Sequence, residues 1–332
     1  MAYGGYPYNL IQLGREATPG TAVAATTAWR GKFATLQDDR KQMNAEEEVG
    51  ILLPTERSYD TWLGVKLALP ETELTYEQWP HLLEAGVKTA TPSGVGPYTR
   101  VYAFPTGASV NTIKTYTIEA GNTLVTADVK EAAYCYVEEF EISGKQGEAW
   151  KMKGGWVGQR LVASTFTASI ALPAVSEAIF ANTKLYIDNS GATLGTTQVL
   201  GTLMGATVRV KTGIMYVPVG DGTLYYSAHK FTRPEVNVTL TMELEQSVGG
   251  VSRVATERTA WENKSFRLVR LRCPGISPRT FDVDMAVKWD KVGDYENSDG
   301  NTTVQLTGHA AYSATDAAFW SATVVNSLAT LP

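Results

Sequence analysis

The stretch CYVEEFEISGKQGEAWKMKGGWVG, residues 135–158, predicts a β-hairpin with one apolar face and one charged face. The first arm alternates, so that we expect Tyr136, Phe140 and Ile142 on one side and Val137, Glu139, Glu141 and Ser143 on the other. Residues 144–147 are typical of a turn, and the second arm returns with Trp150, Met152 and Trp156 facing away from Lys151 and Lys153. Because each large aromatic side chain buries about 150–250 Å², the aromatic face must be covered, whereas the charged face is available for another role.

A second stretch repeats this design at residues 280–312, TFDVDMAVKWDKVGDYENSDGNTTVQLTGHAAY. Its first arm alternates apolar residues (Phe281, Val283, Met285, Val287, Trp289) with charged ones (Asp282, Asp284, Lys288, Asp290). A Gly-, Asn- and Asp-rich turn is expected after Asp290, followed by a return arm with Val304, Leu306 and Gly308. Aligning residues 139–142 with residues 282–285 matches acid with acid and apolar with apolar.

The order of predicted elements suggests an internal duplication. Residues 75–87, TYEQWPHLLEAGV, predict a helix that begins with a capping box at Thr75 and Gln78, ends near Gly86, and buries Trp79, Leu82 and Leu83. A second helix is expected at residues 251–263. Each half then reads as strand, helix, strand and hairpin, so the chain is predicted to be mainly β, with one repeat at 1–162, including an N-terminal arm at 1–30, and another at 163–332.

Length and composition limit the kind of protein this is. A chain of 332 residues with 44% hydrophobic residues can bury a sizeable core, in about two domains. The formal net charge of −5 and the lack of a basic stripe argue against tight DNA binding. No signal peptide or membrane-length apolar run is recognised, and Cys135 and Cys273 are expected to be buried free thiols in a reducing cytoplasm.

Sequence motifs for catalysis or metal binding are missing, so no enzyme, metal or cofactor is predicted. The three histidines are scattered, and no HExxH, CxxC, GxSxG or phosphate-loop motif occurs. Two acid pairs, Glu139 with Glu141 and Asp282 with Asp284, leave three interpretations open. They could be the carboxylate pair of a glycan-active enzyme, a solvated sheet face, or an acidic wall that faces phosphate groups.

Several segments, taken in order, resemble the major tail tube proteins of long-tailed, siphovirus-like bacteriophages. They are GREATPGTAVAATT, TYEQWPHLLEAGV, YVEEFEISGKQGEAWKMKGGWVGQ, KLYIDNS and WSATVVNSLATLP, which together span nearly the whole chain. The resemblance implies a tail-tube-type β-sandwich or barrel with a flanking helix. It also implies rings that stack into the virion's tail tube, assembled in the host bacterial cytoplasm. The expected partners are further copies of the chain, the tape measure protein, and the tail terminator and tail tip proteins. DNA passes through the tube without specific binding.

The resemblance gives the candidate residues their expected roles. Glu139, Glu141, Asp282 and Asp284 would line the lumen and repel DNA. Contacts between rings are expected in the N-terminal arm (Gly14, Arg15, Glu16, Pro19) and after Asp290 (Asp294, Glu296). Two repeats per chain imply a ring of three chains with pseudo-six-fold symmetry, whereas one unit per chain implies a homohexamer. The alternative is a monomeric virion or surface β-sandwich that acts as a binding or decoration module.

Overall fold

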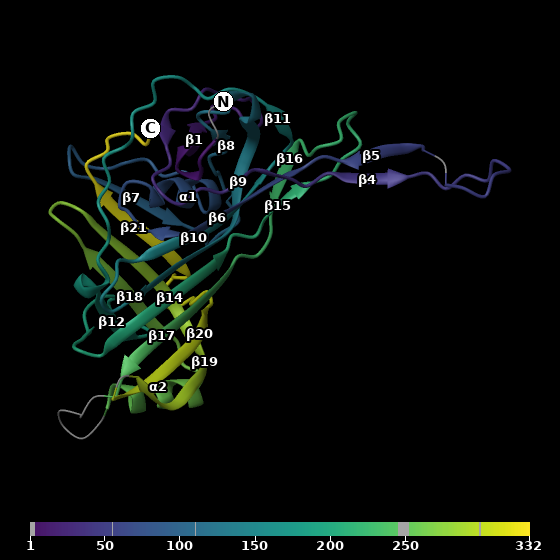
Figure 1. The fold of residues 1–332 in the computed structure, drawn as a ribbon. Coiled ribbons are helices and arrows are strands. Elements are labelled where there is room, and N and C mark those ends of the chain that lie inside the picture. Colours follow the sequence, from purple (N-terminus) through teal and green to yellow (C-terminus); the bar gives the residue numbers. More distant parts are fainter. Residues whose placement is uncertain (1–3, 55, 110, 245–251, 299) are drawn as a thin grey trace.

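The computed structural model describes residues 4–54, 56–109, 111–244, 252–298 and 300–332, and Figure 1 shows their arrangement. Antiparallel strands dominate, which confirms the prediction of a mainly β, sandwich-like protein. The first half contains α1 (Trp79–Gly86) and the strands β1 (Asn9–Arg15), β2 (Thr27–Ala28), β3 (Gln37–Asp38), β4 (Lys41–Asn44), β5 (Ser58–Trp62), β6 (Val65–Glu73), β7 (Tyr98–Ala103), β8 (Tyr116–Asn122), β9 (Lys130–Lys145), β10 (Lys151–Gly158) and β11 (Leu161–Ala163). The second half contains α2 (Arg253–Glu262) and the strands β12 (Lys184–Asn189), β13 (Gln198–Val199), β14 (Leu203–Lys211), β15 (Ile214–Val217), β16 (Ala228–Phe231), β17 (Glu235–Glu243), β18 (Arg267–Pro274), β19 (Thr280–Ser298), β20 (Asn301–Ala310) and β21 (Trp320–Asn326).

The long strand β9 connects two layers in the first half. Its first part pairs with β8 and β11, and β8 continues through β1 to β2. Its second part pairs with β10, which continues through β6 to β3. Side chains from both groups of strands and from α1 share one buried core, in which Trp79, Leu82 and Leu83 are fully buried.

The long strand β19 has the corresponding position in the second half. Its first part pairs with β18 and β21, and β18 continues through β12 to β13. Its second part pairs with β20, which continues through β17 to β14. The expected turn after Asp290 is wrong, because β19 runs on to Ser298 and the chain reverses before Asn301.

Strand β14 joins the two halves, because it pairs with β17 on one side and with β9 on the other. In this junction Lys211 lies opposite Glu139 and Arg209 lies opposite Glu141. The hydrophobic core is continuous across the junction, and the Tyr76 hydroxyl, in the first half, donates to the Cys273 carbonyl in the second at 3.1 Å. Cys135 and Cys273 are both free and buried, as expected.

A β-bulge at Glu138 changes the predicted faces of the opening hairpin. The register against β10 shifts there, so that Glu139 pairs with Gly155 while Val137 pairs with Trp156. One extra residue reverses the alternation. Val137, which was expected on the polar face, therefore joins Phe140 in the core, and Tyr136 lies in a second cluster with Tyr226.

The N-terminal segment and α1 also differ from the sequence prediction. Residues 9–15 were expected in a loose arm, but they form β1 within the sheet, paired along their length with β8. Helix α1 begins only at Trp79, which places Pro80 in the first turn, where its missing N–H costs no hydrogen bond. Thr75 still accepts a hydrogen bond from the Gln78 N–H through its hydroxyl, at 3.3 Å.

Two β-hairpins leave the body side by side, β4–β5 and β15–β16, and β4–β5 extends far from the rest of the molecule (Figure 1). They contact each other near their bases, where the ring of Trp62 stacks on that of Tyr216 at 4.8 Å. The tip of the longer hairpin exposes Ile51, Leu52 and Leu53.

Candidate interaction surface

One side of the continuous sheet carries polar side chains that point away from the core. We call this side the polar face, and it is formed by β6, β10, β9, β14, β17 and β20. A shallow cavity of about 420 Å³ lies on it, lined by Glu71, Ser143, Gly144, Lys145, Glu148, Lys151, Gly205, Ala206, Thr207, Thr239, Thr241 and Gln305. The polar face includes Glu139 and Glu141, the two acids predicted on the first hairpin.

The two predicted acids of the polar face, Glu139 and Glu141, are paired with basic side chains. Glu141 binds Lys153 at 2.9 Å, and Glu139 binds Arg209 at 2.7 Å. The hydrogen bond to Glu139 raises the pKa of Arg209. Exposed pairs of this kind add little stability, but they neutralise the field of the carboxylates. The predicted acidic wall is therefore replaced by a surface on which the two signs of charge alternate.

The second acid pair lies elsewhere, in the part of β19 between β18 and β21. Asp282 accepts two hydrogen bonds from Arg272, both at 2.7 Å, and Asp284 accepts two from Arg270, at 2.6 and 2.7 Å. Since the four acids come from two separate regions, they do not form one acidic surface.

The predicted contacts between rings divide into buried and exposed residues. Gly14 and Glu16 are buried, and the Glu16 carboxylate accepts hydrogen bonds from Thr115, Thr117 and the Tyr134 N–H. Arg15 reaches inward to Glu84, with its Nη2 2.6 Å from the Glu84 carboxylate. Three of the four predicted arm residues therefore belong to the packed sheet.

The other predicted contact residues are on the surface. Pro19 lies in an exposed turn, and Asp294 and Glu296 lie on the exposed end of the β19–β20 hairpin. These three remain available to a neighbouring molecule.

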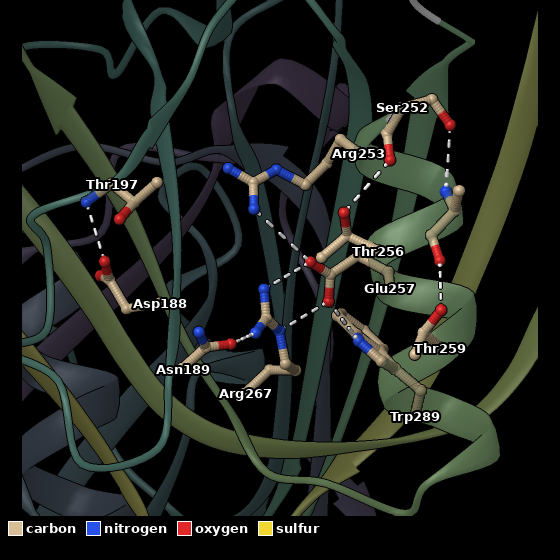
Figure 2. Close-up of polar contacts among 11 residues, drawn as sticks. Asp188, Asn189, Thr197, Ser252, Arg253, Thr256, Glu257, Thr259, Arg267 and Trp289 are labelled. Carbon is tan, nitrogen blue, oxygen red and sulfur yellow. Dashed lines mark hydrogen bonds and ion pairs between the residues drawn. The ribbon is translucent and has the colours of Figure 1, made fainter. Parts of the chain in front are cut away.

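Sequence reasoning missed a buried carboxylate in each helix. Glu257 of α2 is fully buried and accepts hydrogen bonds from Arg267, at 2.8 and 2.7 Å, and from the Trp289 indole at 2.9 Å (Figure 2). Glu84 of α1 accepts from Arg15 and from the Tyr116 hydroxyl, at 3.1 Å. A glutamate within the apolar stripe of a short helix is the signal that could have revealed both.

The continuous sheet formed by β3, β6, β10, β9, β14, β17, β20 and β19 has an open edge at each end among the residues that the structure describes. Strand β3 pairs with β6 on one side only, and the part of β19 at residues 288–298 pairs with β20 on one side only. Open edges offer unpaired N–H and C=O groups to another strand. At the bulge, the Asp290 carbonyl accepts a hydrogen bond from the Trp261 indole at 3.0 Å.

Comparisons with known proteins give no family. No protein-family model matches the chain, and no curated protein matches it. Within the described ranges, the side chains of His, Cys, Asp and Glu form no group of three or more that could hold a metal ion. Over the same residues, no helix has the length and apolar character needed to cross a membrane.

Proposed function

We propose that three copies of this chain close into a ring with pseudo-six-fold symmetry, and that such rings stack into the tail tube of a long-tailed bacteriophage. In this proposal each half of the chain, 1–162 and 163–332, is one copy of the same unit. The tube is a conduit for DNA during genome ejection, and the chain is a structural virion protein without catalytic activity.

The strand pairings support two tandem copies, because those of one half correspond to those of the other. In the first half the pairs are β1–β2, β1–β8, β8–β9, β9–β11, β9–β10, β10–β6 and β6–β3. In the second half they are β12–β13, β12–β18, β18–β19, β19–β21, β19–β20, β20–β17 and β17–β14. In both halves a projecting hairpin precedes β6 or β17, and a helix follows it.

Residue-level features support the same correspondence. The bulge at Glu138 matches a bulge at Asp290, where the register between β19 and β20 shifts between Trp289 and Lys291. The sequence comparison aligned residues 139–142 with residues 282–285. The two bulges instead align Glu138 with Asp290. Each helix also carries a buried glutamate bound by an arginine, Glu84 with Arg15 and Glu257 with Arg267. The two arginines lie on strands that do not correspond, β1 and β18, so only the glutamates and their helices match.

The observation that carries the proposal is the junction between β9 and β14. There β9, the last strand of the first half's sheet, pairs with β14, the first strand of the second half's sheet. In the proposal this pairing is the contact by which one unit accepts the edge of the next. The same relation leaves β3 and the second part of β19 unpaired at the two ends of the continuous sheet. A contact between unlike edges that repeats around an axis closes into a ring, and closure pairs both of these edges.

The proposed lumen is the polar face. Its paired charges, together with Thr207, Thr239 and Thr241, provide a surface with little net field, over which the phosphates of DNA meet neither strong attraction nor a strong barrier. The contribution of Glu139 and Glu141 is then to cancel Lys153 and Arg209. Asp282 and Asp284 have no part in the lumen.

Mass photometry and negative-stain microscopy of the purified protein test this proposal. We expect rings with the mass of three chains, and hollow tubes at high protein concentration. A ring of six chains would contradict the tandem copies. A compact monomer at all concentrations would favour the decoration module instead.

A further inference from the structure

We infer that β3 of one copy pairs with the open part of β19 of a second copy, and that the two kinds of junction in the ring have opposite charge polarity. Each edge then accepts only its proper mate. This inference rests on the proposed ring. It adds the register of the contact between chains and the residues that specify it.

The register follows from the two bulges. If Glu138 corresponds to Asp290, then Glu139 corresponds to Lys291. The neighbouring strands agree with this correspondence. In the first half Trp156 pairs with Val137 on one side and with Leu67 on the other. In the second half Gly308 takes the same place, between Trp289 and Val238.

The same correspondence continues to the first strand of each sheet. Lys66 lies one residue before Leu67 and pairs with Gln37, whereas Asn237 lies one residue before Val238 and pairs with Arg209. Gln37 therefore corresponds to Arg209, and Asp39 to Lys211. Burial agrees, because Leu36 and its counterpart Val208 both lie in the core.

The junction within the chain places a base on the incoming strand and an acid on the receiving strand. Lys211 of β14 lies opposite Glu139 of β9, and Arg209 binds the same Glu139 at 2.7 Å. Applied to the second junction, this register places Asp39 opposite Lys291. There the incoming strand carries the acid and the receiving strand carries the base.

The reversal discriminates against wrong pairings. If the edge of β3 met β9, Asp39 would face Glu139, and if the edge of β14 met β19, Lys211 would face Lys291. Like charges directly opposite each other destabilise a strand pair, whereas opposite charges stabilise it. All four edges are open in a chain whose junctions have not yet formed, so the charges favour the two correct combinations over the two incorrect ones.

The local surroundings leave these charges able to act. Lys291 is exposed, whereas Asp39 is partly exposed and lies 3.1 Å from Lys66. Some of the other charged groups near the edges are paired within the chain, namely Arg40 with Asp38 and Asp60, and His309 with Asp290. Asp294 and Glu296 lie further along the same edge of β19 and are exposed. Asp39 in front of Lys291 would thus be shared between two lysines, whereas at the junction within the chain Glu139 binds Arg209 at 2.7 Å and Lys211 binds Glu235 at 2.9 Å.

Charge substitutions test the polarity. We expect Lys291→Glu or Asp39→Lys alone to raise the protein concentration needed for ring formation by roughly fivefold or more at low salt. The double variant Asp39→Lys with Lys291→Glu should return it toward the wild-type value. Lys184→Glu, an exposed substitution on β12 outside both junctions, is the matched control.

Cysteine pairs test the register. Asp39→Cys with Lys291→Cys should form a disulfide between chains, as judged by covalent oligomers under oxidising conditions. The reference pair, Lys211→Cys with Glu139→Cys, should form one within the chain, and Asp39→Cys with Tyr295→Cys should form none. The native thiols are buried and do not compete.

The outcomes separate this inference from the proposed function. If the wild-type protein forms no ring, the proposed function fails and this inference fails with it. If rings form but the single charge variants behave like Lys184→Glu, or the double variant is no better than the single ones, the charge polarity is refuted. If rings form without a disulfide between residues 39 and 291, the register is refuted.

Discussion

Replacing Glu257 by glutamine should cost a large part of the stability of the protein. The carboxylate is fully buried, and the Arg267 side chain that it binds is only 4% exposed. Glutamine keeps the size of the side chain but removes its charge, which leaves a buried guanidinium without a counterion. Breaking a buried ion pair in this way costs about 3–5 kcal/mol, against a total stability of about 5–15 kcal/mol for typical proteins.

The first half offers a graded comparison. Glu84→Gln leaves Arg15, whose side chain is 28% exposed and can recover hydration. We therefore expect a smaller loss, about 1–3 kcal/mol. Glu262→Gln, an exposed position on the same helix as Glu257, is the control and should change stability by less than about 0.5 kcal/mol.

Urea unfolding, followed by both tryptophan fluorescence and circular dichroism, measures these changes. Coincidence of the two transitions would establish that a single free energy of unfolding describes the chain. A Glu257→Gln variant as stable as Glu262→Gln would refute the argument that the charge of Glu257 holds α2 to β18 and β19.

The remaining predictions concern packing, a close approach and pH. Leu82→Ala in α1 should lower the free energy of unfolding by about 2–5 kcal/mol, since Leu82 is fully buried, and thermal unfolding checks this. Gly144→Ala should be more destabilising than Gly147→Ala, because a methyl group at residue 144 would collide with the Phe180 ring. At residue 147 no atom lies within 4 Å of the added methyl group, and only the positive φ of 83° opposes alanine. Equal melting temperatures of the two variants would contradict this prediction. Burial lowers the pKa of His81 from 6.5 to about 3, so between these pH values the unfolded chain binds a proton that the folded protein does not. The free energy of unfolding should therefore fall as the pH drops from 6.5 toward 3. His81→Gln should make this pH dependence of the free energy of unfolding weaker, and an unchanged pH dependence would count against the prediction.

The fold class could be predicted from the sequence because alternation survives in long strands. The alternating apolar side chains at positions 281–289 are buried, and so are Trp79, Leu82 and Leu83 of α1, as their periodicity indicates. The bulge at Glu138 could not be predicted, since one inserted residue leaves no mark in composition and yet reverses the faces of Tyr136 and Val137.

The charge pairing on the polar face was the feature that the sequence predicted least well. The acids at 139 and 141 are local features, but the base that neutralises Glu139 is Arg209, which lies on a strand 70 residues further along the chain. The strand at residues 9–15 was missed for a similar reason: its apolar pattern is short, and its stability depends on pairing with β8, about a hundred residues away.

The core shared between the halves also constrains how such a chain can change over time. Separating the two halves would uncover Tyr76 and Cys273, which now shield each other, together with the apolar residues beneath β9 and β14. Two separately made halves would have to find each other before either was fully protected from water. Because one polypeptide carries both halves, they are always present in a one-to-one ratio. Separate chains would reach that ratio only if their concentrations were matched.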